Sequence, residues 1–435
     1  MGCHTRAQMG GRRRSCIVIV VALVLGVATG CAEARRHRHP GRHHAGSAHW
    51  IAAWIASPEG AGPGTAFARG FRDQTIRNVI NTSAGGTLVQ VRLDNTFGGG
   101  SLMIGRAAIG VVERGSALVP GTSEPLTFHG RHSVAIPPGQ HMLSDPIQLT
   151  VHPFESLAVS VFLPYATGPP TQHDDAKEDN YVAGGDQVLD ADPPRFARSL
   201  DSWYFISGLE VWDPSPNHGV VVALGDSITN GNGSASGANA RWPNDLERRL
   251  AALPGGPSLS VVDAGIEGNR VLNPAPCCGP SALTRFDPDV LGQAGVREVI
   301  VFEGINDIGF GSSNSPLADP RVDVSAQQII AGYKQLIARA HAAGLKIFGA
   351  TLTPFKGSQH WTRAGEAKRD AINAWIRHSG AFDGVIDFAR AVADPRDHQR
   401  LKPRYDDGDH LHMNDAGYEA MADAVNLAML LRGVE

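Results

Sequence analysis

The sequence predicts an α/β domain of three layers with five parallel strands over residues 219–435, preceded by an all-β, sandwich-like domain over residues 50–205. In residues 50–205, apolar residues alternate with polar or small ones at a period of two, and glycine- or proline-rich turns separate the runs. In residues 219–435, short apolar runs alternate with longer stretches of helical periodicity. Such alternation is typical of a βαβ series whose parallel sheet is covered by helices on both faces.

The period of two is clearest in residues 88–93 and 157–163, whose side chains alternate between apolar and polar or small types. The turns between such runs contain Gly85-Gly86, Gly98-Gly99-Gly100 and Pro137-Pro138-Gly139. This pattern favours an antiparallel β-sandwich, in which no catalytic spacing of residues is visible. Residues 206–218, which include two prolines, form the predicted linker to the α/β domain.

Five predicted strands and four long predicted helices make up the α/β domain. The strands cover residues 220–224, 259–263, 299–302, 346–350 and 385–388, and the helices cover residues 242–253, 326–343, 366–378 and 415–431. Ligands of open α/β sheets bind at the carboxyl ends of the strands. Polar residues that directly follow these strands are therefore the candidate site residues.

Ser227 follows the first strand, within Gly225-Asp226-Ser227-Ile228-Thr229. A serine hydroxyl attacks at neutral pH only when a base takes its proton and another group orients that base. In Asp409-His410-Leu411-His412, an aspartate precedes His412 by three residues, so one loop can supply both groups. His410 competes for the role of base. Taken alone, Ser227 is also a suitable helix cap, and His412 a suitable surface residue.

The next two strands end in polar loops, Gly265-Ile266-Glu267-Gly268-Asn269-Arg270 and Glu303-Gly304-Ile305-Asn306-Asp307-Ile308. Acyl transfer develops negative charge on a carbonyl oxygen, which preorganised N–H groups stabilise. The backbone amides of Ser227 and Gly268 and the side-chain amide of Asn306 are the predicted donors of this oxyanion hole. Each of the last two residues, taken alone, also fits a turn.

Together these blocks resemble the Ser, Gly, Asn and His blocks of the SGNH hydrolases, also called GDSL esterases. The resemblance extends from residue 219 to the C-terminus and implies a flavodoxin-like fold and a catalytic triad of Ser227, Asp409 and His412, with Gly268 and Asn306 in the oxyanion hole. The family often has proline directly after the histidine, where this chain has Met413. No Gly-x-Ser-x-Gly occurs in the chain, so the nucleophile elbow of the α/β-hydrolases is not an alternative.

The resemblance implies a serine esterase that forms an acyl-enzyme and needs no cofactor or metal. The expected substrate is a small ester or an acylated polysaccharide, with O-acetyl or short acyl groups on carbohydrate preferred. The alternatives are a lipase or arylesterase, a transacylase with the same triad, and a surface protein that binds glycans without catalysis. The formal net charge of −4 offers no general attraction to nucleic acid, and no nucleic-acid-binding motif occurs.

The N-terminus predicts export. Arg12-Arg13-Arg14 precede an apolar run over residues 17–29 that is too short to span a bilayer, so residues 1–30 are the expected signal peptide. Ala28-Thr29-Gly30-Cys31 resembles a bacterial lipobox, which predicts a cell-surface protein lipidated at Cys31, with its only membrane contact through that anchor. Simple secretion is the alternative. Residues 31–49, basic and rich in histidine, are the predicted tether, and metal binding is the other interpretation of that tract.

Cys277 and Cys278 are adjacent in the loop after the second strand, and an exported protein meets an oxidising compartment. Neighbouring Cα atoms lie about 3.8 Å apart, below the usual disulfide range of roughly 4.4 to 6.8 Å, so a bond between these cysteines is expected to be strained. Two thiols in a surface loop are the alternative.

Overall fold

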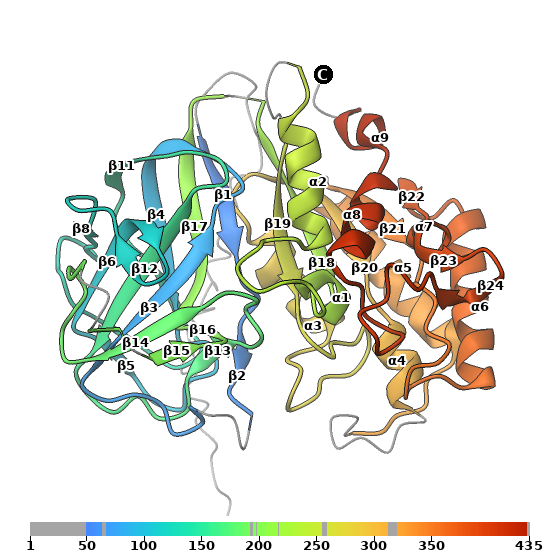
Figure 1. Cartoon of the computed structure of the whole chain (residues 1–435), viewed down its shortest axis with the longest axis horizontal. Helices are drawn as coiled ribbons and strands as arrows, with labels where there is room; N and C mark the ends of the chain where they lie inside the picture. Colours follow the sequence, from blue (N-terminus) through green and yellow to red (C-terminus); the bar gives the residue numbers. More distant parts are fainter. Residues whose placement is uncertain are drawn as a thin grey trace, which may run out of the picture. The chain divides into compact units, whose positions relative to one another are not determined.

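Residues 49–62, 67–191, 195–196, 198–215, 217–254, 259–311 and 320–432 are described by a computed structural model (Figure 1). The predicted signal peptide, Cys31 and the tether up to residue 48 lie outside the described residues. No helix within the described ranges is long and apolar enough to cross a membrane. Residues Ala45–Glu435 form one compact unit, which contains both the β-rich and the α/β part.

Antiparallel sheets build the β-rich part. One sheet has the order β1 (His49–Ile55), β17 (Ile206–Asp213), β4 (Gly86–Asp94) and β10 (His141–Leu143), with β11 (Ile147–Val151) also paired to β4. The larger sheet has the order β15 (Arg198–Leu200), β14 (Asn180–Gly184), β3 (Gln74–Asn81), β12 (Ser156–Leu163), β6 (Arg106–Arg114) and β7 (Ala117–Leu118), with β8 (Glu124–Pro125) paired to β6. A β-rich part before the α/β part is thus confirmed, while the sandwich stays a prediction.

Two smaller antiparallel sheets complete this part. One contains β16 (Trp203–Tyr204), β13 (Thr171–His173) and β2 (Glu59–Gly60), and the other contains β5 (Leu102–Ile104) and β9 (Val134–Ile136). The sheet of β16, β13 and β2 matters for function because the C-terminal end of β13 contacts the α/β part. There the ring of His173 hydrogen-bonds through Nε2 to Asn230 Oδ1 at 2.9 Å.

The prediction of a linker over residues 206–218 is wrong for its first eight residues, which form strand β17. This strand pairs antiparallel with both β1 and β4. The physical reason is that Leu209 and Val211 are fully buried, so the period of two continues past residue 205 into this segment. The change of direction into the α/β part therefore comes only after Asp213.

The five-stranded parallel sheet of the α/β part confirms the prediction. Its order is β19 (Leu259–Gly265), β18 (Gly219–Gly225), β20 (Val296–Phe302), β21 (Lys346–Ala350) and β22 (Gly384–Ile386). Residues 220–224 at its centre are fully buried, which explains their continuous apolar character. Because β19 and β20 flank β18, the loops that follow all three strands open at the same sheet edge.

Helices connect these strands. The long ones are α2 (Trp242–Ala251), α5 (Ala326–Ala342), α6 (Arg363–His378) and α8 (Asp415–Asp423), and the short ones are α1 (Ser227–Asn230), α3 (Ala282–Phe286), the π-helix η2 (Asp287–Leu291), α4 (Ile305–Phe310), α7 (Phe388–Val392) and α9 (Leu427–Leu431). A two-residue strand β23 (Ala393–Asp394) pairs with β24 (Asp397–Leu401). Helix α2 packs against α8, and α5 packs against α6 (Figure 1).

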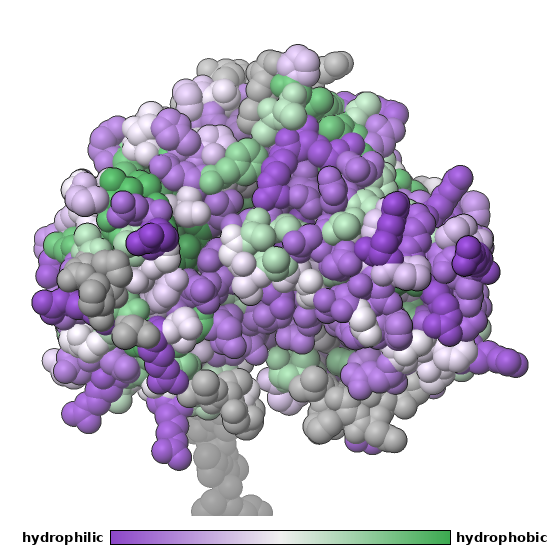
Figure 2. All heavy atoms as spheres, in the orientation of Figure 1, coloured by the Kyte–Doolittle hydropathy of each residue, from purple (hydrophilic) through white to green (hydrophobic). Residues whose placement is uncertain are grey.

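Two predicted boundaries differ from the structure. The helix expected over residues 415–431 is interrupted, since α8 ends at Asp423 and Asn426 precedes α9. The last strand ends at Ile386 because the Asp387 side chain accepts a hydrogen bond from the Arg390 amide and starts α7. The face drawn in Figure 2 is mainly hydrophilic, with separate small apolar patches, as expected when the sheets bury most apolar side chains.

Glu298 is expected to make the free energy of unfolding depend on pH. This β20 side chain is 2% exposed, and burial raises its pKa from 4.5 to about 8, although Lys346 and Arg297 act in the opposite direction. Its stabilising contribution is complete below pH 4.5 and is lost as pH rises through about 8. The free energy of unfolding of the Glu298→Gln variant should therefore fall less between pH 5 and pH 9 than that of the wild type, by at most about 1.4 kcal/mol per pH unit.

Urea titrations at each pH measure this difference. Glu113→Gln, at an exposed position of β6, is the control with the same change of charge and should keep the wild-type slope. Equal slopes for Glu298→Gln and the wild type would contradict the prediction.

Candidate active site

Ser227 begins helix α1 directly after strand β18, at the carboxyl edge of the parallel sheet. The side chain of Asp226 caps this helix by accepting a hydrogen bond from the Ile228 amide at 3.0 Å. Gly225 leaves no room for a side chain, since an added Cβ would lie 2.1 Å from Thr229 Oγ1. The turn therefore holds Ser227 in a fixed position, where it is 4% exposed.

The loop before α8 supplies the partners of Ser227. The Nε2 atom of His412 lies 2.8 Å from Ser227 Oγ, and its Nδ1 atom lies 2.6 Å from Asp409 Oδ2. Asp409 Oδ1 accepts the amides of Leu411 and His412, both at 2.8 Å. Partial burial acts to raise the pKa of Asp409, but the hydrogen bond from the His412 ring, the charge of that ring and the amides outweigh it and hold this pKa well below its usual value.

These contacts assign the proton positions on His412. Because Asp409 is ionised near neutral pH, it accepts the Nδ1 proton, and Nε2 is left with a lone pair directed at the Ser227 hydroxyl. The arrangement can accept the hydroxyl proton at Nε2 and can stabilise the resulting imidazolium.

His410 lies in a different environment. Its Nδ1 atom contacts Asp406 Oδ2 at 2.5 Å, and its ring is 47% exposed, compared with 12% for the ring of His412. His410 also has a positive φ of 64°, which directs the chain around the loop. The geometry therefore brings His412 rather than His410 to Ser227.

The loop after β19 places Gly268 beside the same pocket. Gly268 has a φ of +68°, and an added Cβ would lie 2.6 Å from Cys278 Sγ, so glycine is required both by its backbone and by its neighbour. Among the described residues, no acceptor takes the backbone N–H of Gly268 or of Ser227. Both amides are available to a carbonyl oxygen that develops negative charge.

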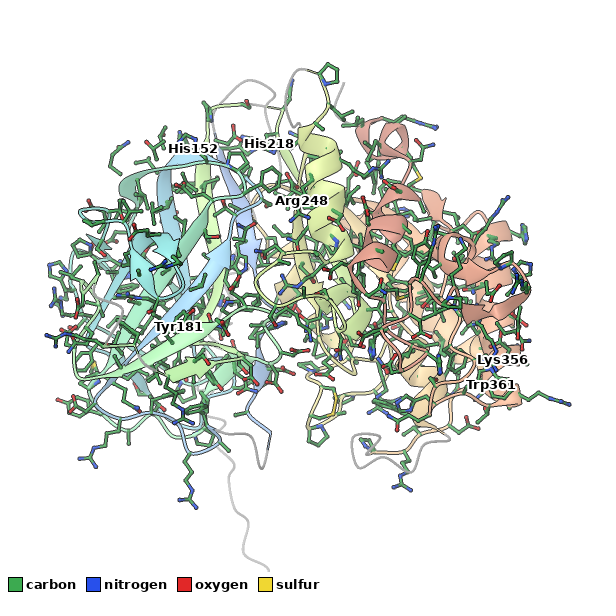
Figure 3. The ribbon with its side chains drawn as sticks, viewed as in Figure 1. His152, Tyr181, His218, Arg248, Lys356 and Trp361 are labelled. Atoms are coloured by element: carbon green, nitrogen blue, oxygen red, sulfur yellow. A yellow bond between two sulfur atoms is a disulfide. The ribbon has the colours of Figure 1, made fainter. Side chains whose placement is uncertain are left out.

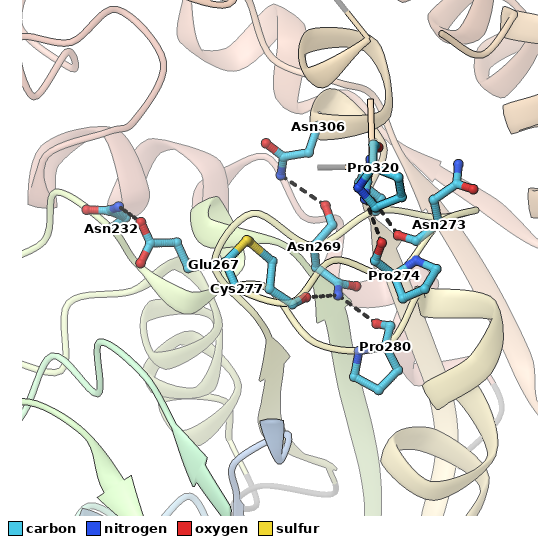
Figure 4. Close-up of a disulfide and its surroundings, with 11 residues drawn as sticks. Asn232, Glu267, Asn269, Asn273, Pro274, Cys277, Pro280, Asn306 and Pro320 are labelled. Atoms are coloured by element: carbon cyan, nitrogen blue, oxygen red, sulfur yellow. Dashed lines mark hydrogen bonds between the residues drawn. A yellow bond between two sulfur atoms is a disulfide. The ribbon is translucent and has the colours of Figure 1, made fainter. Parts of the chain in front are cut away.

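Asn306 comes from the first turn of α4 and is 6% exposed. One N–H of its side-chain amide is donated to the Asn269 carbonyl at 3.0 Å (Figure 4). A carboxamide carries two N–H groups, so the second remains for the pocket that Asn306 lines. The next residue, Asp307, accepts the amides of Val271 and Leu272 and ties the same loop to α4.

A disulfide joins Cys277 and Cys278 in this loop (Figure 4). Both residues line the pocket together with Ser227. Their Cα atoms are 3.8 Å apart. The Asn269 side chain stabilises the loop, because its Nδ2 donates to the carbonyls of Cys278 at 2.7 Å and Pro280 at 2.8 Å. The pair thus forms part of the wall of the pocket that Gly268 and Asn306 also line.

The pocket has a volume of about 200 Å³ and contains side chains that the sequence did not indicate. Its lining residues are Asp174, Ser227, Glu267, Gly268, Cys277, Cys278, Asn306, Phe310, Gln359, His360, Leu411 and His412. Asp174 belongs to the β-rich part, where Ser202 Oγ donates to its Oδ1 at 2.8 Å and its amide donates to Glu59 at 2.8 Å. The β-rich part therefore contributes directly to this site.

His360 lies on the loop after β21 and packs against Phe310 with ring centroids 5.6 Å apart. Lys356 and Trp361 belong to the same loop (Figure 3). Lys356 forms an ion pair with Asp397 at 2.8 Å, and Trp361 donates to Glu366, so both residues hold the loop. Burial and the nearby charge of His412 lower the pKa of His360. No sequence motif marks this histidine, so its place in the pocket depends on tertiary packing.

Arg285 of α3 stabilises the backbone behind the site, a role that was not predicted from the sequence. Its guanidinium donates to the Gly225 carbonyl at 2.8 Å, to the Ala264 carbonyl at 2.6 Å and to Asn269 Oδ1 at 2.9 Å. It thereby joins the ends of β18 and β19, the two strands that precede Ser227 and Gly268. Asp289 balances its charge at 2.9 Å.

Three buried carboxyl groups follow β18 and β20, and one of them, Glu303, lies 3.6 Å from this guanidinium. Burial raises the pKa of Asp226 to about 7 and that of Asp307 to about 6, and it raises the pKa of Glu303 well above its ordinary value. Among the described residues, no group of three or more His, Cys, Asp or Glu side chains is arranged to hold a metal ion. The absence of a metal or cofactor requirement stays a prediction.

Comparisons with known proteins agree with these blocks. The chain matches the profile of the GDSL-like Lipase/Acylhydrolase family over residues 223–420. It is accordingly a hydrolase of ester bonds. In the comparison with curated proteins, none matches the chain.

Solved structures that resemble the chain include three bacterial enzymes. A lipase/acylhydrolase from Enterococcus faecalis is 18% identical, covers 49% of this chain and 96% of its own, and has a TM-score of 0.38. An acetylxylan esterase from Geobacillus stearothermophilus, in a catalytic mutant form, is 19% identical, covers 50% and 94%, and has a TM-score of 0.37. A GDSL-like lipase from Bacteroides thetaiotaomicron VPI-5482 is 16% identical, covers 48% and 87%, and has a TM-score of 0.36.

Proposed function

We propose that the protein is an exported serine esterase that removes O-acetyl or other short acyl groups from carbohydrate through an acyl-enzyme. The observation that carries the catalytic part is the continuous chain of contacts from Asp409 through His412 to Ser227 Oγ, with distances of 2.6 and 2.8 Å. Gly268 and Asn306 line the same pocket on the side of the expected oxyanion.

In the proposed reaction, Ser227 Oγ attacks the ester carbonyl while His412 Nε2 takes its proton. The amides of Ser227 and Gly268 and the side chain of Asn306 hold the oxyanion. His412 then protonates the departing alcohol oxygen, and the carbonyl reforms as an acyl-serine. A water molecule, deprotonated by His412, attacks this ester, and Ser227 leaves with its proton restored.

The size of the pocket supports a short acyl group. Pockets that bury drug-sized ligands have volumes of about 300 to 1,000 Å³, and this one has about 200 Å³. Cys277, Cys278, Phe310 and Leu411 supply an apolar surface for a small acyl chain.

The polar groups of the pocket support an uncharged alcohol portion. Asp174 and Glu267 add carboxylate oxygens, which accept hydrogen bonds from hydroxyl groups, and among the described residues no lysine or arginine lines this pocket. A sugar offers such hydroxyl groups. The β-rich part, through Asp174, then acts on the alcohol side of the substrate.

The test of the proposed function is hydrolysis of a panel of chromogenic esters with acyl chains of increasing length, together with acetylated oligosaccharides. Turnover should be highest for acetyl esters and should depend on Ser227. Efficient turnover of long-chain esters only, or Ser227-independent turnover, would contradict the proposal.

The acidic pocket wall predicts discrimination by charge. At equal acyl group, the wild type should hydrolyse neutral 4-acetoxybenzamide with a higher kcat/KM than anionic 4-acetoxybenzoate, since a like charge near Asp174 and Glu267 costs on the order of 1 kcal/mol. In the double variant Asp174→Asn with Glu267→Gln, this ratio should fall by about fivefold. Steady-state kinetics on the two esters measures it.

Glu113→Gln removes a charge on β6, away from the pocket lining, and should leave the ratio unchanged. The prediction is wrong if the double variant loses activity on both esters equally, which would indicate a structural role for the two carboxylates.

The location of the protein is tested at Cys31. We expect the mature chain to begin at a lipidated Cys31 and to partition with membranes in a bacterial host, and Cys31→Ser to release it. Mass spectrometry of the purified N-terminus distinguishes this result from an unmodified terminus elsewhere, which would leave simple secretion.

A further inference from the structure

A second, larger cavity lies between the β-rich part and the α3–η2 segment, outside the lining of the active-site pocket. Its volume is about 510 Å³, within the range of pockets that bind small molecules. Strands β4, β10 and β17 form one wall through Arg92, His141 and Glu210. Residues of α3, η2 and the turn after η2, including Arg285 and Gln293, form the other.

The polar groups of this cavity are arranged in pairs that leave acceptor atoms open. Arg92 donates to Glu210 Oε1 at 3.0 Å and to Gln293 Oε1 at 3.2 Å, and Arg285 is paired with Asp289. Both arginines that line the cavity are thus neutralised by a carboxylate. Asp94, which also lines it and is 3% exposed, uses Oδ1 to accept the Thr96 amide at 2.8 Å.

Ser207 gives an independent indication of a missing partner. Its side chain is 96% buried in the cavity wall, at 4% relative exposure, and its Oγ has no hydrogen-bond partner among the described residues. A buried hydroxyl without a partner costs free energy, and a rotation of the Ser207 side chain toward the cavity would let a ligand hydroxyl satisfy it.

Apolar surface lies beside these polar groups. Phe97 is half-buried and lines the cavity with Ile55, Pro58, Leu143 and Pro288. A ring that presents C–H groups on one face and hydroxyl groups at its edge can use both kinds of surface. Burial and the charge of Arg92 lower the pKa of His141, so this histidine adds no cation near neutral pH.

We propose that this cavity is a binding site for a neutral saccharide, with Asp94, Glu210 and Ser207 bonded to its hydroxyl groups and Phe97 against its ring. An anionic ligand is disfavoured, because each arginine already has a carboxylate partner and Asp94 adds negative charge. A lipid chain is disfavoured, because it would leave the Ser207 hydroxyl and the open carboxylate oxygens of Asp94 and Glu210 without partners.

The cavity and the active-site pocket share a wall, so the variants that test the cavity must leave this wall unchanged. Pro280 lines the second cavity, while Cys277 and Cys278 of the same loop line the active-site pocket. Arg285 lines the cavity and also holds Gly225 and Asn269. A variant at Arg285 would disturb both sites, so the test uses Asp94, Glu210 and Phe97.

The experiment is isothermal titration of the full chain carrying Ser227→Ala with unacylated xylohexaose, cellohexaose and chitohexaose as the probes. Ser227→Ala prevents turnover, so the outcome does not depend on esterase activity. At least one neutral hexasaccharide should bind, and Asp94→Asn with Glu210→Gln, or Phe97→Ala, should weaken its Kd at least tenfold. Glu113→Gln on β6 is the charge-matched control and should bind as the parent does.

Thermal unfolding of each variant identifies loss of folding, and a variant with a lowered Tm is replaced by Ser207→Ala, which removes only a hydroxyl. Three results would overturn the proposal: no binding of any neutral hexasaccharide, binding that the cavity variants leave unchanged, or tighter binding of polygalacturonate hexamer, an anionic probe, than of the neutral ones.

Discussion

Ser227→Ala and His412→Ala are each expected to lower kcat for acetyl-ester hydrolysis by about three to six orders of magnitude, with the fold retained. Ser227 Oγ supplies the atom that bonds to the acyl group, and His412 Nε2, at 2.8 Å, is the base that it contacts. Without either group, only the oxyanion donors and substrate binding remain to accelerate the reaction.

The two variants should also be non-additive. Because the serine and the histidine act in one proton transfer, the double variant should be about as slow as the slower single variant. Burst kinetics with 4-nitrophenyl acetate measures acyl-enzyme formation directly, and circular dichroism and Tm report the fold. Multiplied effects in the double variant would argue for two independent roles.

His410→Ala is the matched control, since it removes the same ring two residues away in the same loop. His410 contacts Asp406 and is largely exposed, so a change in kcat of less than about tenfold is expected. Loss of activity in His410→Ala with retention in His412→Ala would reverse the assignment of the base.

The parallel sheet could be predicted from sequence because its strands are buried on both faces. Residues 220–224 form an unbroken apolar run, and the structure buries all of them completely. Ser227, Gly268 and Asn306 could be selected as candidates because each follows such a strand within a few residues. The strand order then places the loops that carry these three residues, which are far apart in the chain, at the same edge of the sheet.

Other parts of the site depend on packing between segments that no local pattern connects. Asp174 lines the pocket, and its neighbour His173 hydrogen-bonds to Asn230 across the two parts of the chain. Arginine is usually an exposed residue, yet Arg285 is 2% exposed and donates hydrogen bonds to Gly225, Ala264 and Asn269. Long-range hydrogen bonds of this kind leave no periodicity in the sequence.

Helix ends were the other source of error, and they have a local cause. Asp387 follows the last strand and caps α7 with one side-chain hydrogen bond. Such a cap stabilises a helix by about 1 kcal/mol. The helix expected over residues 415–431 contains Asn426, whose side chain suits a position before a helix better than one within it. Small free-energy differences therefore decide boundaries that the apolar pattern leaves open.

Asn306→Ala is expected to lower kcat by about two to three orders of magnitude and to change KM much less, because the amide matters most when the carbonyl oxygen becomes negative. The loss corresponds to about 2.7 to 4 kcal/mol of transition-state stabilisation. Steady-state kinetics on acetyl esters separates kcat from KM. A phosphonate that mimics the tetrahedral intermediate should likewise inactivate the variant far more slowly than the wild type.

The variant also removes the hydrogen bond from Asn306 to the Asn269 carbonyl, so a shift of the loop that carries Gly268 must be distinguished from loss of an oxyanion donor. Asp307→Asn is the control, because Asp307 braces the same loop through the amides of Val271 and Leu272 but lies outside the pocket lining. If loop position alone mattered, the two variants would show the same kinetic pattern, with a lowered Tm in each. A selective fall of kcat in Asn306→Ala, at nearly unchanged Tm, is the result expected of a group that binds the oxyanion, whereas an unchanged kcat would leave Asn306 with the loop contact as its only role.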